Sequence, residues 1–137
     1  MRVSFNENLR ARHISSGGRR LYFDEENLDH GTVFDVIGLE FSIGDDDTTA
    51  MTYVIVVDHW DRPLSMPIIF FDMIDARASR HWRVFSSTSL GAVTLRHWAL
   101  EDPSYFEKLW DRDEVMMENL RTALRETSEE WHSGTSE

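Results

Sequence analysis

Apolar and polar positions alternate over the first two thirds of the chain in a pattern that predicts β-strands. In residues 32–43 the apolar side chains fall mostly on one parity, which indicates a long strand with one exposed face. Residues 51–57 form a continuous apolar, β-branched run typical of a central strand. The polar turn at 44–49 joins these two segments into a predicted hairpin. Weaker patterns predict further strands at residues 1–5, 19–23 and 68–71.

A second predicted hairpin lies in residues 80–98, a segment that begins and ends with Arg-His-Trp. A three-residue loop with Gly91 in the left-handed position sets the expected register. In that register Trp82 faces Trp98, Val84 faces Arg96, and Phe85 faces Leu95 on the opposite, core side. If the C-terminal helix covers the tryptophans, the repeated tripeptide belongs to the core; if not, it is a candidate binding surface.

The two histidines of this repeat are candidates for a shared site only in another register. With the expected pairing, His97 faces Arg83, which disfavours a protonated imidazole at that position. His81 and His97 approach one another only if the register differs by two residues.

From Asp102 onward the pattern changes to that of a helix. Asp102 suits an N-cap, Pro103 suits the first helical position, and apolar residues then recur every three to four positions. The stripe is interrupted at Asp113, so the helix is either continuous or broken near 111–113. Residues 133–137 are a predicted polar tail.

These elements predict one α+β domain over residues 1–132. Its core is a mostly antiparallel sheet of about five to six strands, and the C-terminal helix packs on one face. The length of 137 residues and the 41% hydrophobic content suffice for a single core. No segment is apolar and long enough to cross a membrane or to form a signal peptide, which favours a soluble cytoplasmic protein.

Composition excludes several chemistries. The chain has no cysteine, so disulfides, thiolate zinc sites and cysteine nucleophiles are ruled out. No cofactor motif is present. The net charge of −11 is divided into basic segments at 1–23 and 76–100 and acidic segments at 24–75 and 101–137. This surplus of negative charge disfavours nucleic acid as a partner.

The main catalytic alternative is the Asp-His-x-Asp sequence that follows the strand at 51–57. Asp58, His59 and Asp61 are residue types that bind divalent cations, and a small metal-dependent enzyme could use them. In an extended chain, however, Asp58 and His59 point to opposite faces. A polar strand end before a proline turn is the favoured explanation of this sequence, because Asp is common before turns, so no metal is assigned.

Binding of another protein is the favoured function. The basic segment 76–100 holds arginines and tryptophans that are typical of interface hot spots: Arg80, Arg83, Arg96, Trp82 and Trp98. Acidic loops provide a surface that attracts a basic partner: Asp24, Glu25, Glu26, Asp45, Asp46 and Asp47. We therefore expect a non-enzymatic, inhibitory or immunity-like protein that acts on a basic, nucleic-acid-handling target. A structural subunit of a larger assembly, including a homo-oligomer, is a further alternative.

Overall fold

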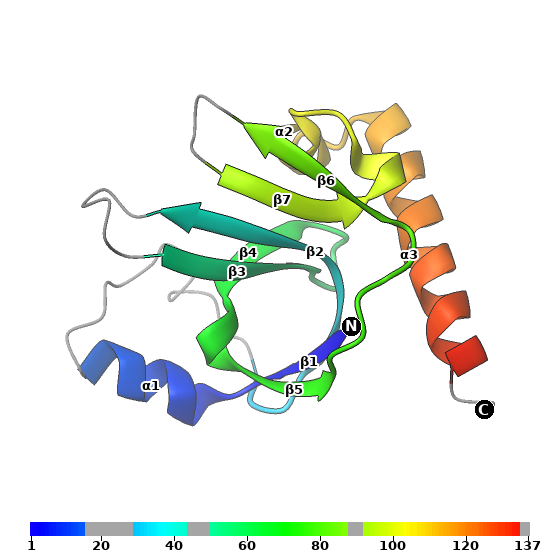
Figure 1. Ribbon diagram of the computed structural model, residues 1–137. Helices are drawn as coiled ribbons and strands as arrows, with labels where there is room; N and C mark the ends of the chain where they lie inside the picture. The colour runs from blue at the N-terminus through cyan, green and yellow to red at the C-terminus, as the bar shows by residue number, and fades with distance from the viewer. Residues whose placement is uncertain (16–28, 44–49, 88–91, 135–137) are drawn as a thin grey trace.

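The protein is an α+β domain in which one antiparallel sheet of seven strands carries the helices. The computed structural model describes residues 1–15, 29–43, 50–87 and 92–134 (Figure 1). The strands are β1 (Arg2–Phe5), β2 (Val33–Ile43), β3 (Ala50–Val57), β4 (Pro63–Pro67), β5 (Phe71–Asp75), β6 (Trp82–Ser87) and β7 (Ala92–His97). The α-helices are α1 (Glu7–Ser15), α2 (Tyr105–Trp110) and α3 (Glu114–Gly134), and the 3-10 helices are η2 (Ile68–Phe70) and η3 (Trp98–Leu100). The predicted fold class is confirmed, with more strands than expected.

Strand β2 is the centre of the sheet. The main strand order is β4-β3-β2-β1-β5, and β7 pairs with both β2 and β6. The first part of β2 pairs with β1, whereas residues 38–42 pair with β7. The sheet therefore opens into two branches, with β1 and β5 below and β7 and β6 above in Figure 1. The predicted hairpin of β2 and β3 is confirmed.

A bulge in β2 reverses which side chains face each side of the sheet. The pairing of β2 with β3 shifts between Val36 and Gly38. Before the shift Val36 faces the inner cluster, and after it Leu39 does, although the two positions have opposite parity. The sequence pattern had placed Val33 and Leu39 on one buried face, which is wrong for Val33, since it is 52% exposed.

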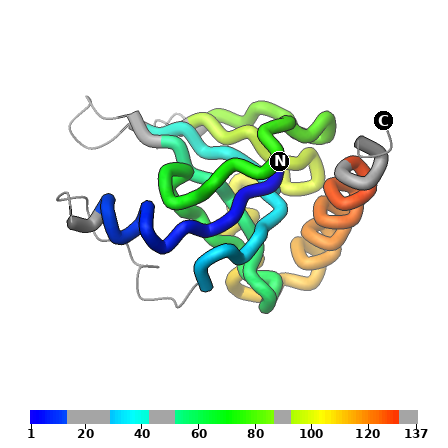
Figure 2. The backbone as a smooth tube through the Cα atoms, turned by 90° about the horizontal axis from the view of Figure 1, so that it is seen from below, coloured from blue at the N-terminus to red at the C-terminus, as the bar shows by residue number. Residues whose placement is uncertain are grey.

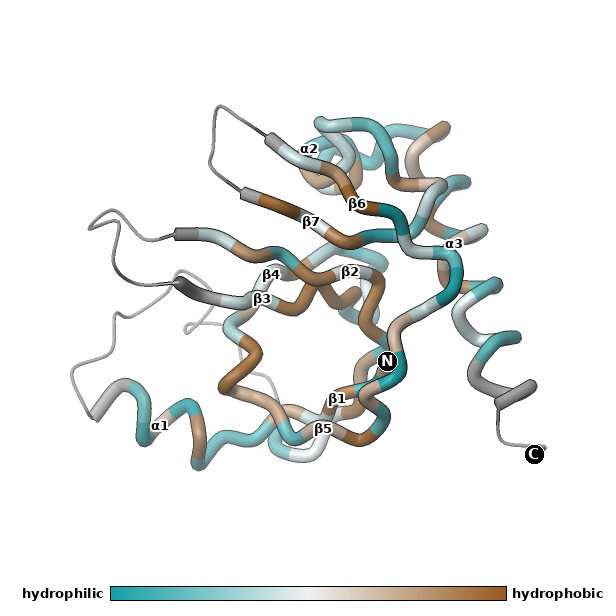
Figure 3. Tube along the Cα trace, in the orientation of Figure 1, coloured by the Kyte–Doolittle hydropathy of each residue, from teal (hydrophilic) through white to brown (hydrophobic). Residues whose placement is uncertain are grey.

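The core consists of two clusters, one on each side of the sheet. The hydrophobic positions that supply them recur along the strands (Figure 3). The inner cluster lies within the curl of the strands and includes residues of η2 and of every described strand except β7: Val3, Phe5, Phe34, Val36, Leu39, Val54, Val56, Leu64, Met66, Phe70, Phe71 and Trp82. The outer cluster joins β2 and β3 to η3, α2 and α3: Ile37, Ile55, Leu100, Tyr105, Leu109, Met116, Met117, Leu120 and Ala123. Burial of these apolar surfaces is the main stabilising term.

The C-terminal helix is broken into two helices, α2 and α3. This confirms the second of the two predicted alternatives, a continuous helix or one that is broken near 111–113. Helix α2 ends at Trp110 and α3 begins at Glu114. Between them Arg112 adopts a φ of 60°, which ends the first helix, and the Asp113 carboxylate accepts a hydrogen bond from Met116 N–H and starts the second. Figure 2 shows α3 along one side of the sheet, with α1 at the far end. None of the described helices combines the length and the apolar character that a membrane crossing requires.

Two segments differ from the sequence prediction. Residues 63–67, where Pro63 and Pro67 favour a loop rather than a strand, form β4, while the expected strand at 68–71 is largely the 3-10 helix η2. Proline is tolerated in β4 because, among the described strands, it pairs only with β3, so its other edge donates no N–H to a strand that the structure describes. Helix α1 was not predicted; the Asn6 side chain caps it by accepting from the backbone of Asn8 and Leu9. The predicted strand at 19–23 lies outside the described residues.

The β6–β7 hairpin forms, but its register differs by one residue from the prediction. Trp82 pairs with His97 and Phe85 pairs with Thr94, so the expected pairs of Trp82 with Trp98 and Phe85 with Leu95 are wrong. A shift of one residue reverses the relative faces of two strands. The prediction pairs Thr88 with Ala92, whereas the structure pairs Ser87 with Ala92. The predicted loop with a left-handed Gly91 lies outside the described residues.

Candidate functional site

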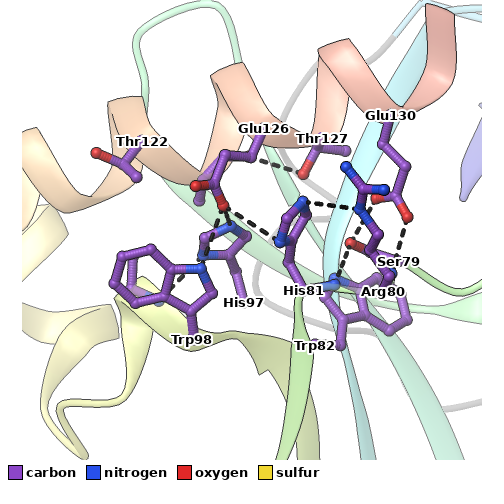
Figure 4. Close-up of polar contacts among 12 residues, drawn as sticks. Ser79, Arg80, His81, Trp82, His97, Trp98, Thr122, Glu126, Thr127 and Glu130 are labelled. Carbon is purple, nitrogen blue, oxygen red and sulfur yellow. Dashed lines mark hydrogen bonds and ion pairs between the residues drawn. The ribbon is translucent and has the colours of Figure 1, made fainter. Parts of the chain in front are cut away.

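One carboxylate oxygen on α3 receives contacts from both Arg-His-Trp repeats. Glu126 Oε2 lies 2.6 Å from His97 Nε2, 3.2 Å from Trp98 Nε1 and 3.5 Å from His81 Nδ1 (Figure 4). His81 precedes β6, and His97 ends β7, so the hairpin places both imidazoles beneath the helix. The two rings lie 5.4 Å apart. His81 and His97 thus come together after a register change of one residue rather than the two that we expected.

The hydrogen bonds of His97 define its proton position. Nδ1 accepts a hydrogen bond of 3.0 Å from Ala99 N–H, so this nitrogen carries no proton. The neutral ring therefore carries its proton on Nε2 and donates it to Glu126. The His97 side of this bond is completely buried, whereas the Glu126 side chain is 23% exposed.

The pKa shifts of the pair agree with a neutral imidazole beside a charged carboxylate. Burial lowers the pKa of His97 below its usual 6.5, and the Glu126 carboxylate only partly opposes this effect. For Glu126, burial raises the pKa, but the hydrogen bond from His97 and the potential of His81 outweigh it, so the pKa falls below 4.5.

A second carboxylate, one helical turn later, binds the chain before β6. Glu130 Oε2 accepts from Ser79 Oγ at 2.7 Å, and Oε1 accepts from Arg80 N–H at 2.8 Å. The positions 126 and 130 lie on one face of α3 because a turn contains 3.6 residues. Glu126 and Glu130 together attach α3 to both strands of the hairpin, which gives this cluster a structural role.

His81, His97 and Glu126 also have the composition of a metal site, since one ligand atom of each lies within 4.8 Å of the others. A cation bound at His97 Nε2 requires the proton of that ring to move to Nδ1. A proton on Nδ1 would point at the N–H of Ala99, so two donors would face each other and the present hydrogen bond from Ala99 to Nδ1 would be lost. The arrangement therefore fits a hydrogen-bonded clamp better than a resident metal ion.

The structure assigns the predicted Asp-His-x-Asp residues to a turn. Asp58 Oδ1 accepts from the backbone of Trp60 and Arg62, and Oδ2 accepts from Arg62 Nε at 2.9 Å. His59 is exposed and lies beside Trp60, with the ring centroids 4.7 Å apart and the ring planes tilted by 44°. Asp61 occupies the left-handed region, with a φ of 58°. Asp58 is thus committed to local bonds, and the described residues bring no third ligand to it.

The predicted Arg-Trp surface is divided between core and solvent. Trp82 is buried in the inner cluster, and its indole Nε1 has no hydrogen-bond partner among the described residues. Arg96 is also buried: its guanidinium lies 4.0 Å from the centre of the Phe85 ring and 4.6 Å from that of Tyr105. It donates to the carbonyls of Leu100 and Glu101, which fixes the chain between η3 and α2.

The remaining predicted binding residues are exposed or lie outside the described residues. Arg80 and Arg83 are exposed beside β6, and Trp98 is 45% exposed on η3. Trp98 also borders a hollow of about 540 Å³ with Glu101, Asp113 and Val115 among its other lining residues. The acidic loop residues Asp24, Glu25, Glu26, Asp45, Asp46 and Asp47 fall outside the described part of the chain.

A surface that the sequence prediction missed lies where the β3–β4 turn meets the α2–α3 loop. We call Trp60, Arg62, Trp110 and Arg112 the Trp60–Trp110 surface. The Arg62 guanidinium lies 5.0 Å from the centre of the Trp110 ring, and Arg112 donates to the Trp60 carbonyl at 2.7 Å. Trp60 is 61% exposed and Trp110 is 37% exposed. The available signals were a tryptophan within a turn and another directly before the helix break.

Both non-glycine residues with positive φ in the described chain belong to the two loops of this surface. They are Asp61 and Arg112, with φ values of 58° and 60°. Such conformations are costly and persist where the surrounding structure holds them. Segments 58–62 and 111–114 also contain five acidic residues and two arginines, so the exposed aromatic rings stand in a negatively charged environment.

Comparison of the chain with protein-family models, with curated proteins and with solved structures finds no match.

Proposed function

We propose that the protein docks on a basic surface of another protein through the Trp60–Trp110 surface. The observation that carries this proposal is the exposure of two tryptophans, one in the β3–β4 turn and one at the end of α2, which arginine contacts hold together. Tryptophan and arginine are among the residues most enriched at interface hot spots. The indole buries a large area with few rotatable bonds, and the guanidinium offers several hydrogen-bond donors and stacks on aromatic rings.

Charge selects the class of partner. The two loops carry Asp58, Asp61, Asp111, Asp113 and Glu114 against two arginines, and one of these, Arg62, already pairs with Asp58. The residual negative charge accelerates the approach of a cationic surface and disfavours an anionic one. Inhibition by occlusion of a basic, nucleic-acid-handling protein is the specific form of this function that we favour.

Affinity capture from an extract of the native host tests the proposal through variants. Wild-type protein is compared with Trp60→Ala and with the double charge reversal Asp111→Lys, Glu114→Lys. The matched controls are Ile69→Ala, which removes another half-exposed apolar side chain, and Glu129→Lys, which reverses an exposed charge elsewhere on α3.

The expected result is a basic protein that wild type and both controls retain and that both surface variants lose. Each surface variant should weaken binding of the purified partner by about tenfold or more, and the charge reversal should lose its effect in moderate salt. Equal retention by all variants, or capture of an acidic partner alone, contradicts the proposal.

A further inference from the structure

A second surface, independent of the Trp60–Trp110 surface, lies along the outer edge of β6. Among the described strands β6 pairs only with β7, so its other side carries no strand (Figure 1). An unpaired edge exposes backbone donors and acceptors that can bind an added strand.

The hydrogen bonding of the hairpin identifies which backbone groups point outward. Trp98 N–H donates to the His81 carbonyl at 3.1 Å, so the backbone of His81 faces β7. Backbone groups alternate in direction along a strand. Arg83 and Phe85 therefore also face β7, whereas Val84 and Ser86 direct their N–H and C=O groups to the open edge.

One face of this edge is apolar. Val84 is 68% exposed and shares its face with Val93 of β7 and Phe41 of β2, which are 41% and 40% exposed. These side chains continue the inner face of the sheet beyond the core. A strand added beside β6 would place every second side chain next to this apolar row.

The other property of the edge is positive charge. Residues 76–100 contain four arginines and no acidic residue. Arg96 is buried and Arg77 pairs with Asp75, which leaves Arg80 and Arg83 exposed beside the edge. The Arg83 guanidinium lies along the backbone and donates to the carbonyls of Arg80 and Trp82. Both bonds come from Nη1 and hold the guanidinium at this edge, where they occupy the outward carbonyl of Trp82 and leave the other guanidinium N–H groups for a carboxylate on an incoming strand beside Val84 and Ser86.

We propose that the β6 edge binds an extended segment of a partner protein in which apolar and acidic residues alternate. Backbone hydrogen bonds to Val84 and Ser86 hold the segment, the apolar side chains extend the row at Val84, and the acidic ones meet Arg80 and Arg83. A second copy of this chain is disfavoured as the occupant, because antiparallel pairing of two β6 edges brings the arginines of both copies together.

Binding of synthetic peptides to the full chain tests the proposal. The probe is a labelled peptide of alternating Glu and Val, and the matched control replaces each Glu with Lys. We expect the acidic peptide to bind about tenfold or more tightly than the basic one. Hydrogen exchange should slow at the amides of Val84 and Ser86 when the acidic peptide binds, while the amides of Arg83 and Phe85 stay unchanged.

Two variants separate strand addition from simple charge attraction. Val84→Pro removes an outward N–H without removing a bond to β7, and Val84→Thr keeps the backbone donor at nearly the same side-chain volume. We expect Val84→Pro to weaken binding by about tenfold and Val84→Thr by much less. Arg83→Glu should abolish the preference for the acidic peptide. An acidic peptide N-methylated at alternate residues should also lose binding, without any change to the protein.

Three results would overturn the proposal. The first is binding that Arg83→Glu reduces but that neither Val84→Pro nor N-methylation affects, since this indicates charge attraction alone. The second is no difference between the acidic and the basic peptide. The third is a self-association in sedimentation analysis that Val84→Pro abolishes, because it identifies a second copy of the chain as the occupant.

Discussion

His97 Nε2 and Glu126 Oε2 lie 2.6 Å apart, and this contact joins the end of β7 to the middle of α3. The imidazole is completely buried, while the carboxylate also receives the indole N–H of Trp98. The helix that covers the outer cluster is thus attached to the sheet by a charged acceptor as well as by apolar contact.

Replacement of Glu126 by Gln should destabilise the fold by about 2 kcal/mol, because hydrogen bonds to a charged acceptor contribute about 1.5–3 kcal/mol and Gln has no charge. Urea unfolding of the variant measures this change. Glu129→Gln on the exposed side of α3 is the control, and it should stay within about 0.5 kcal/mol of wild type. Equal effects of the two substitutions contradict a clamp at Glu126.

Stability should fall as the medium becomes acidic. The pKa of His97 is lowered from 6.5, so below that pH the unfolded chain binds more protons than the folded one. This contribution is fully present above pH 6.5 and is lost as the pH falls toward the folded value. Glu126 acts in the same direction at lower pH, since its pKa is lowered from 4.5. Unfolding measured across this range should show the loss, with a shallower slope in His97→Asn. Stability that rises on acidification contradicts the assignment.

Nitrogen NMR of the imidazoles should show His97 as the tautomer with its proton on Nε2, because Ala99 N–H occupies Nδ1. Addition of Zn²⁺ should leave these resonances unmoved. The same titration tests the Asp58 turn, since a cation bound there shifts the signals of His59. A shift at both His81 and His97 with Zn²⁺ would show that the clamp opens to bind metal.

Arg96→Lys should cost about 2–4 kcal/mol, although both residues are cations. Lysine cannot lie flat between Phe85 and Tyr105, nor can it donate in the same fork to two carbonyls. Thermal and chemical unfolding measure the loss. Arg83→Lys on the neighbouring strand is the matched control and should have little effect. A small loss for both variants means that the stacked position of Arg96 contributes little.

The sequence predicts the elements of this fold better than the contacts between them. The break between Trp110 and Glu114 follows from local chemistry, since Asp113 can cap a helix whatever surrounds it. The register of β6 and β7 depends instead on the length of the connecting loop, and one residue decides whether Trp82 faces Trp98 or His97. The contacts of Glu126 with His81, His97 and Trp98 were not predicted, because they form only after the strands and the helix have reached their final positions.

The same reasoning explains why the Trp60–Trp110 surface was not predicted. Trp110 lies on an apolar helical stripe, and such a stripe normally faces the core. Here the helix ends at this residue, and its indole instead donates to the Pro63 carbonyl at the rim of the sheet. The sequence contains the stripe and the break, but only the packing of α2 against β4 places the ring at the surface.

Gly38 should be the least replaceable glycine among those described. A Cβ at this position would lie 2.8 Å from the Leu95 carbonyl oxygen and 3.0 Å from Arg96 Cβ, so an added methyl group pushes β2 and β7 apart. Overpacking of this kind costs about 1–3 kcal/mol. Gly38→Ala should therefore lower the unfolding free energy and speed hydrogen exchange in β7.

Gly31→Ala is the control for this substitution, because no atom of the described residues beyond its chain neighbours lies within 4 Å of the added Cβ, although its φ of 86° disfavours alanine. It should cost about 1 kcal/mol through backbone strain alone and leave exchange in β7 unchanged. Faster exchange in β7 for Gly38→Ala but not for Gly31→Ala identifies close strand approach as the reason for glycine at 38. If exchange in β7 is the same in both variants, the bulge in β2 accommodates the methyl group, and the paired strands need not separate.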